Sequence, residues 1–226
     1  QYDRALSIFS PDGRIFQVEY AQLASEKGSP VVFYTDGKSI SICIEKRIEN
    51  KTRIIDDFEK FRRINSKIYL SFAGINPDAL ILIDVAIRIS SEYNYKFKEE
   101  IDIMKLSLEL SDYIQRYTIT GGYRPFGIKI LLFSNEFKPI ISLIEPDGNY
   151  SLYKGGAIGQ KSEKLTEELD KIIKEGLTPT ESVIKALFVT SQKDPKKMSV
   201  YEIDSDKPTY VNLLSVENIS SITSQF

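Results

Sequence analysis

Residues 2–21 read YDRALSIFSPDGRIFQVEYA, near the start of a chain of 226 residues. Within this stretch Ser10 is a good helix N-cap and Pro11 a good first helical residue, because a proline there loses no hydrogen bond. Gly28 is placed to end the helix. Between these points apolar side chains recur at helical spacing, at Phe16, Tyr20, Leu23 and Ala24. The sequence therefore predicts an amphipathic helix over residues 11–28.

The composition is that of an ordinary globular protein, with 42% apolar and 27% charged residues. Thirty Lys and Arg residues against thirty-two Asp and Glu give a net charge of −2. No overall field therefore favours nucleic acid or an anionic membrane. No apolar run approaches the roughly 20 residues that cross a bilayer. We expect neither nucleic acid nor a membrane among the partners.

The chain has no histidine and a single cysteine, Cys43. Without histidine there is no Ser-His-Asp triad, no Cys-His pair and no zinc site with a histidine ligand. Cys43 lies in an alternating apolar pattern, so we expect a small buried residue rather than a reactive thiol. No glycine-rich nucleotide-binding motif occurs. We expect no cofactor, and the chemistry left open is that of carboxylates or of a nucleophile activated by an amine.

The rest of the chain alternates between strand patterns and pairs of helix patterns. Two strands meet at the turn Asp36-Gly37, and Asn76-Pro77 opens the first of two helices. The other expected elements are strands at 68–72, 126–133, 140–144, 150–153, 198–203 and 209–214, a helix over 103–117, and helices begun at Ser162 and Thr178. This order suits two antiparallel sheets packed face to face with helix pairs outside. We predict an α+β protein, a four-layer αββα sandwich with an extra N-terminal helix.

Residues 2–21 resemble the N-terminal signature of the alpha-type subunits of the 20S proteasome. Shorter matches are Ser71-Phe72-Ala73-Gly74 with Asp78-Ala79, Gln115-Arg116-Tyr117-Thr118 with Gly122, and Arg124-Pro125-Phe126-Gly127. Residues 2–9 are most similar to the subunit usually counted fourth in the eukaryotic alpha ring. The resemblance implies a fold like that of N-terminal-nucleophile hydrolases. It also implies one domain over 1–226, with a gating tail at 1–10, a helix at 11–28, a core at 29–214 and a C-terminal tail at 215–226.

The same resemblance implies a non-catalytic subunit of a threonine-type endopeptidase complex. Its expected roles are ring assembly, gating of substrate entry and docking of activators in ubiquitin-dependent protein degradation. The implied partners are other alpha subunits in a heteroheptameric ring, beta-ring subunits, a regulatory particle or other activators, and unfolded polypeptide substrate. The implied location is the cytoplasm and the nucleus.

The resemblance also implies two sites. The gating residues are Tyr2, Asp3, Arg4, Pro11 and Tyr20. Tyrosine and aspartate side chains can hydrogen-bond between neighbouring tails, and Pro11 fixes φ where the tail meets the helix. The second site is a pocket between neighbouring alpha subunits that takes the C-terminal tails of activators.

In that activator-tail pocket Lys60 supplies the positive group, and Gly74 and Ile75 line the wall. A lysine suits a terminal carboxylate because it offers a point charge. One position departs from the family pattern: Leu80 stands where an arginine is common. We therefore expect no salt bridge at the start of that helix.

Two alternatives stay open. In a threonine protease of this fold the nucleophile is freed by cleavage of a Gly-Thr bond, but none of the twelve glycines is followed by threonine. Gly28-Ser29 is the one comparable bond, and Pro30 restricts the backbone beside it. A catalytic N-terminal-nucleophile hydrolase would need its mature terminus at Ser29. The other alternative is a homo-oligomeric ring that acts as a binding scaffold.

Overall fold

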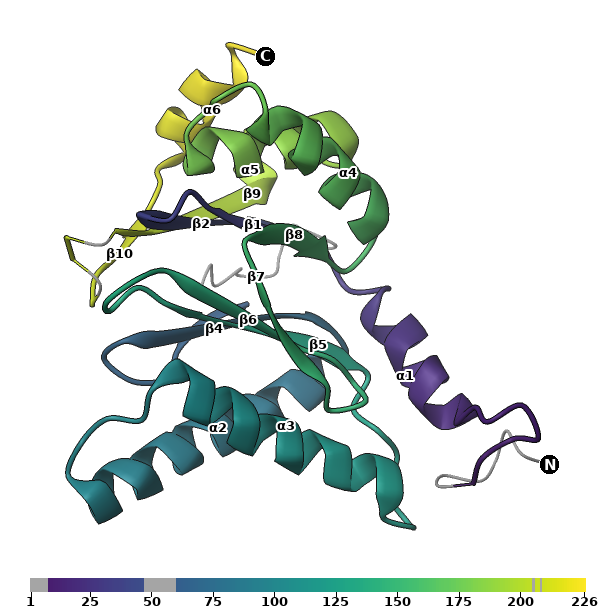
Figure 1. The fold of residues 1–226 in the computed structure, drawn as a ribbon. Coiled ribbons are helices and arrows are strands. Elements are labelled where there is room, and N and C mark those ends of the chain that lie inside the picture. Colours follow the sequence, from purple (N-terminus) through teal and green to yellow (C-terminus); the bar gives the residue numbers. More distant parts are fainter. Residues whose placement is uncertain (1–7, 47–59, 205, 208) are drawn as a thin grey trace, which may run out of the picture.

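The computed structural model describes residues 8–46, 60–204, 206–207 and 209–226. In these ranges there are two five-stranded sheets and six α helices, and the sheets lie face to face between two pairs of helices, which makes four layers (Figure 1). Helices α2 (Asn76–Phe97) and α3 (Ile103–Ile119) lie on one outer face. Helices α4 (Ser162–Ile173) and α5 (Pro179–Thr190) lie on the other. The predicted αββα sandwich is confirmed.

The first sheet has the strand order β10-β9-β2-β1-β8. Its strands are β1 (Val31–Thr35), β2 (Ser39–Glu45), β8 (Gly155–Ile158), β9 (Met198–Asp204) and β10 (Val211–Leu213). The predicted turn between β1 and β2 forms, and Asp36 Oδ1 accepts hydrogen bonds from the amides of Lys38 and Ser39 at 2.8 and 3.0 Å. Cys43 is fully buried on β2, as predicted, and burial raises the pKa of its thiol.

The second sheet has the order β3-β4-β5-β6-β7. Its strands are β3 (Phe61–Arg63), β4 (Ile68–Gly74), β5 (Ile128–Ser134), β6 (Ile140–Ile144) and β7 (Tyr150–Tyr153). Two strands were not predicted. Strand β3 has only three residues, too few to show a period, and β8 begins with two glycines, which favour turns.

The polypeptide passes from one sheet to the other between β7 and β8. Only Lys154 separates these strands, and its carbonyl accepts a hydrogen bond from the amide of Thr35 at 2.9 Å. On this side of the sandwich the two sheets are therefore tied by a single residue of chain.

Three apolar layers fill the spaces between the four layers of structure. One lies between α2, α3 and the second sheet and includes Leu106. Another lies between the sheets and includes Phe133, and the third lies between the first sheet and α4 and α5 and includes Leu187. Each fully buried side chain of this size contributes about 1.5–3 kcal/mol relative to an exposed one. These layers hold the elements that position the site.

For residues 215–226 the sequence leaves open a short terminal helix or a tail, and the segment contains helix α6 (Val216–Thr223). Ser215 caps this helix by accepting a hydrogen bond from the amide of Asn218 at 3.3 Å. Ile219 is buried in the apolar layer beside α5. The segment is thus part of the folded body.

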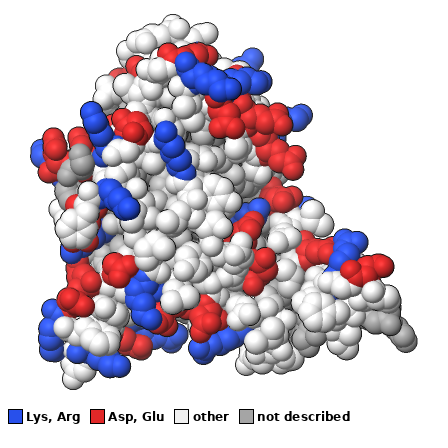
Figure 2. All heavy atoms as spheres, in the orientation of Figure 1, with Lys and Arg blue, Asp and Glu red and all other residues white. Residues whose placement is uncertain are grey.

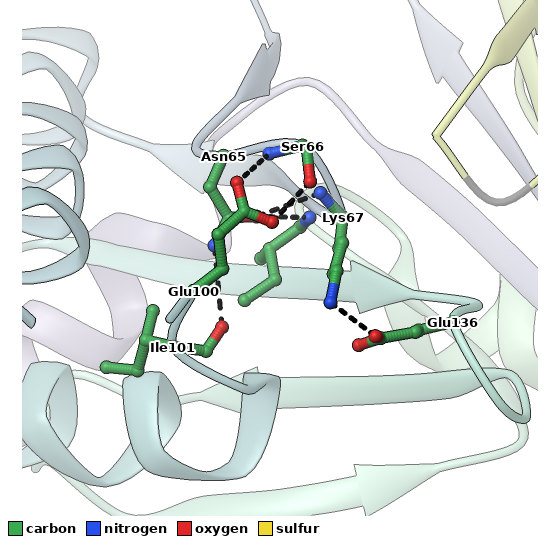
Figure 3. Close-up of polar contacts among 7 residues, drawn as sticks. Asn65, Ser66, Lys67, Glu100, Ile101 and Glu136 are labelled. Carbon is green, nitrogen blue, oxygen red and sulfur yellow. Dashed lines mark hydrogen bonds and ion pairs between the residues drawn. The ribbon is translucent and has the colours of Figure 1, made fainter. Parts of the chain in front are cut away.

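A polar cluster joins the turn between β3 and β4 to two neighbouring loops, as Figure 3 shows. Asn65 Oδ1 accepts from the amides of Lys67 and Ile68 at 2.9 and 2.8 Å, and its Nδ2 donates to Ser90 Oγ and to the carbonyl of Ile101 at 3.2 and 3.4 Å. Ser66 binds Glu100, and Lys67 pairs with Glu136. Because these polar groups are hydrogen-bonded or ion-paired with one another, the cluster holds the turn between β3 and β4 against the two loops. We call this cluster the latch.

We expect Asn65→Ala to lower the free energy of unfolding by about 2 kcal/mol, because several hydrogen bonds in a half-buried turn are lost together. Urea denaturation measures the change. The control is Lys67→Ala, which removes one ion pair on the same turn and should cost less than about 1 kcal/mol. Equal losses in the two variants would contradict the latch.

Candidate functional site

Helix α1 (Phe16–Ser25) projects from the sandwich at the end where β1 begins (Figure 1). Its predicted start at Pro11, with Ser10 as cap, is wrong. Ser10 Oγ accepts from the amide of Arg14 at 3.1 Å, and the amide of Gly13 donates to the carbonyl of Ser10 at 2.9 Å. Gly13 has a φ of 75°, outside the right-handed helical region. These contacts form a separate turn, and the helix begins only at Phe16.

Of the predicted gating residues, the structure describes Pro11 and Tyr20. Pro11 is exposed in the turn before α1. Tyr20 is 48% exposed on α1 and stacks on Phe16 with ring centroids 6.4 Å apart. Tyr2, Asp3 and Arg4 lie outside the described residues.

A groove of about 460 Å³ runs between α1 and the junction of β4 with α2. It is lined by Tyr20, Leu23, Ala24, Lys27, Gly28, Gly74 and Ile75. The groove thus brings together a predicted gating residue, Tyr20, and both predicted wall residues of the pocket. Sequence reasoning missed Lys27 as part of this surface. The signal for it was its spacing, since it lies one helical turn beyond Leu23 and Ala24.

Lys60 does not line this groove, although it lies at the same junction. Its Nζ donates to the carbonyl of Ser29 at 3.0 Å and lies 5.4 Å from the ring centroid of Phe72. Ser29 follows Gly28, which does line the groove. The ammonium group of Lys60 is therefore hydrogen-bonded to the backbone just before β1, next to a residue that lines the groove but outside the lining itself.

Three stretches of backbone approach very closely at this junction. A Cβ atom at Gly28 would lie 2.2 Å from the amide nitrogen of Gly74, and a Cβ at Gly74 would lie 2.3 Å from the carbonyl oxygen of Gly127. A Cβ at Gly127 would lie 2.7 Å from Ile75 Cδ1. At Gly28 and Gly74 the obstruction is backbone, so only glycine fits there, whereas a residue at Gly127 would have to displace the Ile75 side chain. The wall of the groove and the end of α1 are therefore packed without spare volume.

A salt bridge fixes the start of α2, where none was expected because of Leu80. Arg124 donates two hydrogen bonds of 2.7 Å to the Asp78 carboxylate. Asp78 Oδ2 also accepts from the amide of Gly127 at 2.9 Å. The expectation failed because the arginine comes from the segment before β5, 46 residues away, rather than from the neighbouring helical position.

The two members of this ion pair differ in exposure. The Asp78 side chain is 4% exposed and the Arg124 side chain 58%. Burial raises the pKa of the Asp78 carboxyl, but the hydrogen bonds from Arg124 and from Gly127 lower it more, so the net pKa is below the ordinary value. Asp78 therefore stays ionised at neutral pH. Its negative charge lies in the first turn of α2, where it interacts favourably with the positive end of the helix dipole.

Ser29, the alternative nucleophile, is 6% exposed. Its amine is a peptide nitrogen, since Gly28 precedes it. The carbonyl of Gly28 accepts from the amide of Gln160 at 2.9 Å. A Cβ at Gly159 would lie 2.8 Å from the carbonyl oxygens of both Gly28 and Ser29. The Gly28-Ser29 bond is thus enclosed by backbone on several sides.

Two other kinds of site, a metal centre and a membrane-spanning helix, are not found in the described ranges. There the acidic and sulfur side chains form no cluster of three that could hold a metal ion, and no helix is long and apolar enough to cross a bilayer. Basic and acidic side chains are interspersed over the face shown in Figure 2. The groove beside α1 is the candidate functional site because three of the predicted site residues, Tyr20, Gly74 and Ile75, line it.

We expect Asp78→Asn to lower the free energy of unfolding by about 1–3 kcal/mol at pH 7. The pKa of Asp78 is lowered in the folded chain, so its stabilising effect is complete above the ordinary carboxyl pKa of about 3.9 and is lost as pH falls through the lowered value. The difference between the two proteins should therefore shrink in acid. Urea unfolding at a series of pH values measures it.

The control for this series is Asp112→Asn, which removes an exposed ion pair with Arg116 on α3. Its cost should stay below about 1 kcal/mol. A cost for Asp78→Asn that is the same at pH 7 and in acid would contradict the assignment.

Comparison with known proteins places this geometry in a family. The family model described as proteasome subunit matches residues 25–204, and the model of the N-terminal signature of A-type proteasome subunits matches residues 2–24. The chain is 37% identical over 191 residues to the proteasome alpha subunit of Saccharolobus solfataricus, covering 84% of this chain and 79% of the relative. It is 32% identical over 215 residues to that of Archaeoglobus fulgidus, covering 92% and 87%.

The family match spans most of the sandwich, and the signature match covers nearly all of α1. Together with the two relatives, these matches show that the chain belongs to the family of proteasome alpha-type subunits.

Proposed function

We propose that the chain is a non-catalytic alpha-ring subunit of a 20S proteasome. In this role it assembles into the ring, gates substrate entry and docks activators in ubiquitin-dependent protein degradation. The observation that carries the proposal is helix α1, which bears the alpha signature and joins the sandwich beside the groove.

A non-catalytic role is supported by the surroundings of Ser29. A nucleophile of this type needs its own free amine as base, and the amine of Ser29 is held in a peptide bond. The adjoining backbone is packed against Gly159 and Gln160, which leaves little access for a processing protease. The threonine active sites of the particle are then carried by other subunits.

The proposed partners are other alpha subunits in a heteroheptameric ring, beta-ring subunits, a regulatory particle or other activators, and unfolded polypeptide. The proposed location is the cytoplasm and the nucleus. The likeness of residues 2–9 to the fourth eukaryotic subunit is part of this proposal, whereas the two relatives reported above are archaeal.

The proposed gate consists of the tails of neighbouring subunits. Tyr2, Asp3 and Arg4 would hydrogen-bond or pair with groups on the next tail, and a cyclic arrangement can satisfy each group from a neighbour. Pro11 lies in the turn that joins the tail to α1, and this turn is closed by the hydrogen bonds of Ser10. A turn fixed at both ends would set the direction in which the tail leaves the helix.

The proposed docking site for activators is the groove beside α1. Tyr20, Leu23 and Ile75 offer apolar surface for side chains near the end of a tail. A terminal carboxylate would lie in the field of Lys60, behind Gly28, and of Lys27, which lines the groove. Such a site selects for a free carboxyl terminus because two cations lie close to the groove's apolar wall.

Removing residues 1–9 should raise basal peptide hydrolysis by the assembled particle, because the tail then no longer obstructs entry. Fluorogenic peptide turnover without activator measures the change. With saturating activator, the truncated and full-length particles should turn over the peptide at similar rates. Unchanged basal turnover would count against gating by this tail.

Lys60→Ala should weaken binding of a peptide with apolar residues before a free carboxyl terminus by about tenfold, the effect of about 1.4 kcal/mol. Fluorescence polarisation with the assembled particle measures the affinity. The matched control is Lys38→Ala, an exposed lysine in the turn between β1 and β2. An amidated peptide is the control for the ligand. Equal affinities for Lys60→Ala and the unsubstituted particle would remove Lys60 from the site.

A further inference from the structure

We infer that Asp78 and Arg124 are positioning residues for the activator groove: their salt bridge sets the place of the Gly74-Ile75 wall through the backbone of Gly127. This inference rests on the proposed function of the groove. Neither residue lines the groove itself. Their effect on docking would therefore be indirect.

The salt bridge is connected to the groove wall by a closed ring of hydrogen bonds. The amide of Gly127 donates to Asp78 Oδ2 at 2.9 Å, and the carbonyl of Gly127 accepts from the amide of Ile75 at 3.0 Å. The amide of Asp78 donates to the carbonyl of Ile75 at 3.1 Å. A displacement of the Asp78 carboxylate therefore moves the backbone of Gly127, and with it the amide and carbonyl groups of Ile75.

The packing around this ring leaves no room to absorb such a shift. Gly74 has a φ of 136°, and a Cβ on it would lie 2.3 Å from the carbonyl oxygen of Gly127 and 3.1 Å from the Cα of Ser25 at the end of α1. A Cβ on Gly127 would lie 3.2 Å from the Cβ of Ala24, which lines the groove. A displacement of Gly127 therefore moves the groove wall or the end of α1.

The chemistry of the pair requires an arginine. Asp78 is almost completely buried, and an ionised carboxylate in that position is costly unless it is paired. Arg124 supplies two parallel hydrogen bonds and one more, of 3.0 Å, to the carbonyl of Pro125 in its own segment. A lysine would keep the charge but lose the paired geometry. Without Arg124, the carboxylate would turn toward water and release Gly127.

Arg124 is also the better residue to substitute. Its side chain is more than half exposed, so its loss opens no cavity in the apolar layers. The control is an exposed arginine–aspartate pair on α3, where Arg116 donates one hydrogen bond of 3.3 Å to Asp112 and both side chains are more than half exposed. Arg116→Gln removes an ion pair of similar kind that does not touch the groove.

The first measurement is peptide affinity on the assembled particle, with a free-carboxyl peptide that ends in apolar residues. Arg124→Gln should weaken binding by about tenfold, Arg124→Lys should fall between this variant and the unsubstituted particle, and Arg116→Gln should have no effect. Peptide turnover at saturating activator should be unchanged in Arg116→Gln, because this residue does not touch the groove. An unchanged affinity for Arg124→Gln, with Lys60→Ala weakened, overturns the inference and leaves the docking site intact.

The second measurement is hydrogen exchange at the amides of Ile75 and Gly127 in the full chain, which does not depend on ring assembly. Both amides should exchange faster in Arg124→Gln by about tenfold and at the ordinary rate in Arg116→Gln. Ordinary exchange in Arg124→Gln overturns the inference. Faster exchange, with peptide affinity unchanged in both Arg124→Gln and Lys60→Ala, overturns the proposed docking site, and the inference falls with it.

Discussion

The close crossing of backbone at Gly28, Gly74 and Gly127 is the constraint on which the arrangement of the site depends. Each of these glycines sits where a methyl group would collide with backbone or with a neighbouring side chain. The crossing joins the end of α1, the junction of β4 with α2, and the start of β5 at one point. Because the three segments touch directly, α1 and the groove wall form a single unit. The salt bridge between Asp78 and Arg124 closes this unit on its solvent side.

Much of the fold could be predicted because periodicity in the sequence is set by burial. On β4, Ile68, Leu70 and Phe72 face the helices while Tyr69 and Ala73 face the other sheet, and this alternation is visible in the sequence. The helix starts at Asn76 and Thr178 could also be predicted, because a proline or a capping residue favours a helix start at its own position in the chain. Such features depend on neighbours within a few positions, which a single sequence supplies.

The missed features depend on contacts between distant segments or on elements too short to show a pattern. Ser10 has the chemistry of a helix cap, but Gly13 adopts a positive φ and the hydroxyl of Ser10 is used within a turn. Strand β3 exists because Phe61 and Arg63 pair with β4, not because of its own three residues. Arg124 and Asp78 are 46 residues apart, and nothing in either local stretch indicates that they meet. The groove could be anticipated only in part, since Lys27 joins it through the orientation of α1.

The single residue of chain between β7 and β8 has a mechanical consequence. A link of one residue limits how far the ends of β7 and β8 can move apart. On the side of β3 and β10 the sheets are held instead by packing, since the ring of Phe61 stacks on that of Tyr201 with centroids 4.2 Å apart. Strand β1 lies next to β8, close to this link. Helix α1 meets the sandwich where Gly28 crosses the end of β4 and Gly74 crosses the start of β5, so a force on α1 would reach the second sheet directly as well as β1.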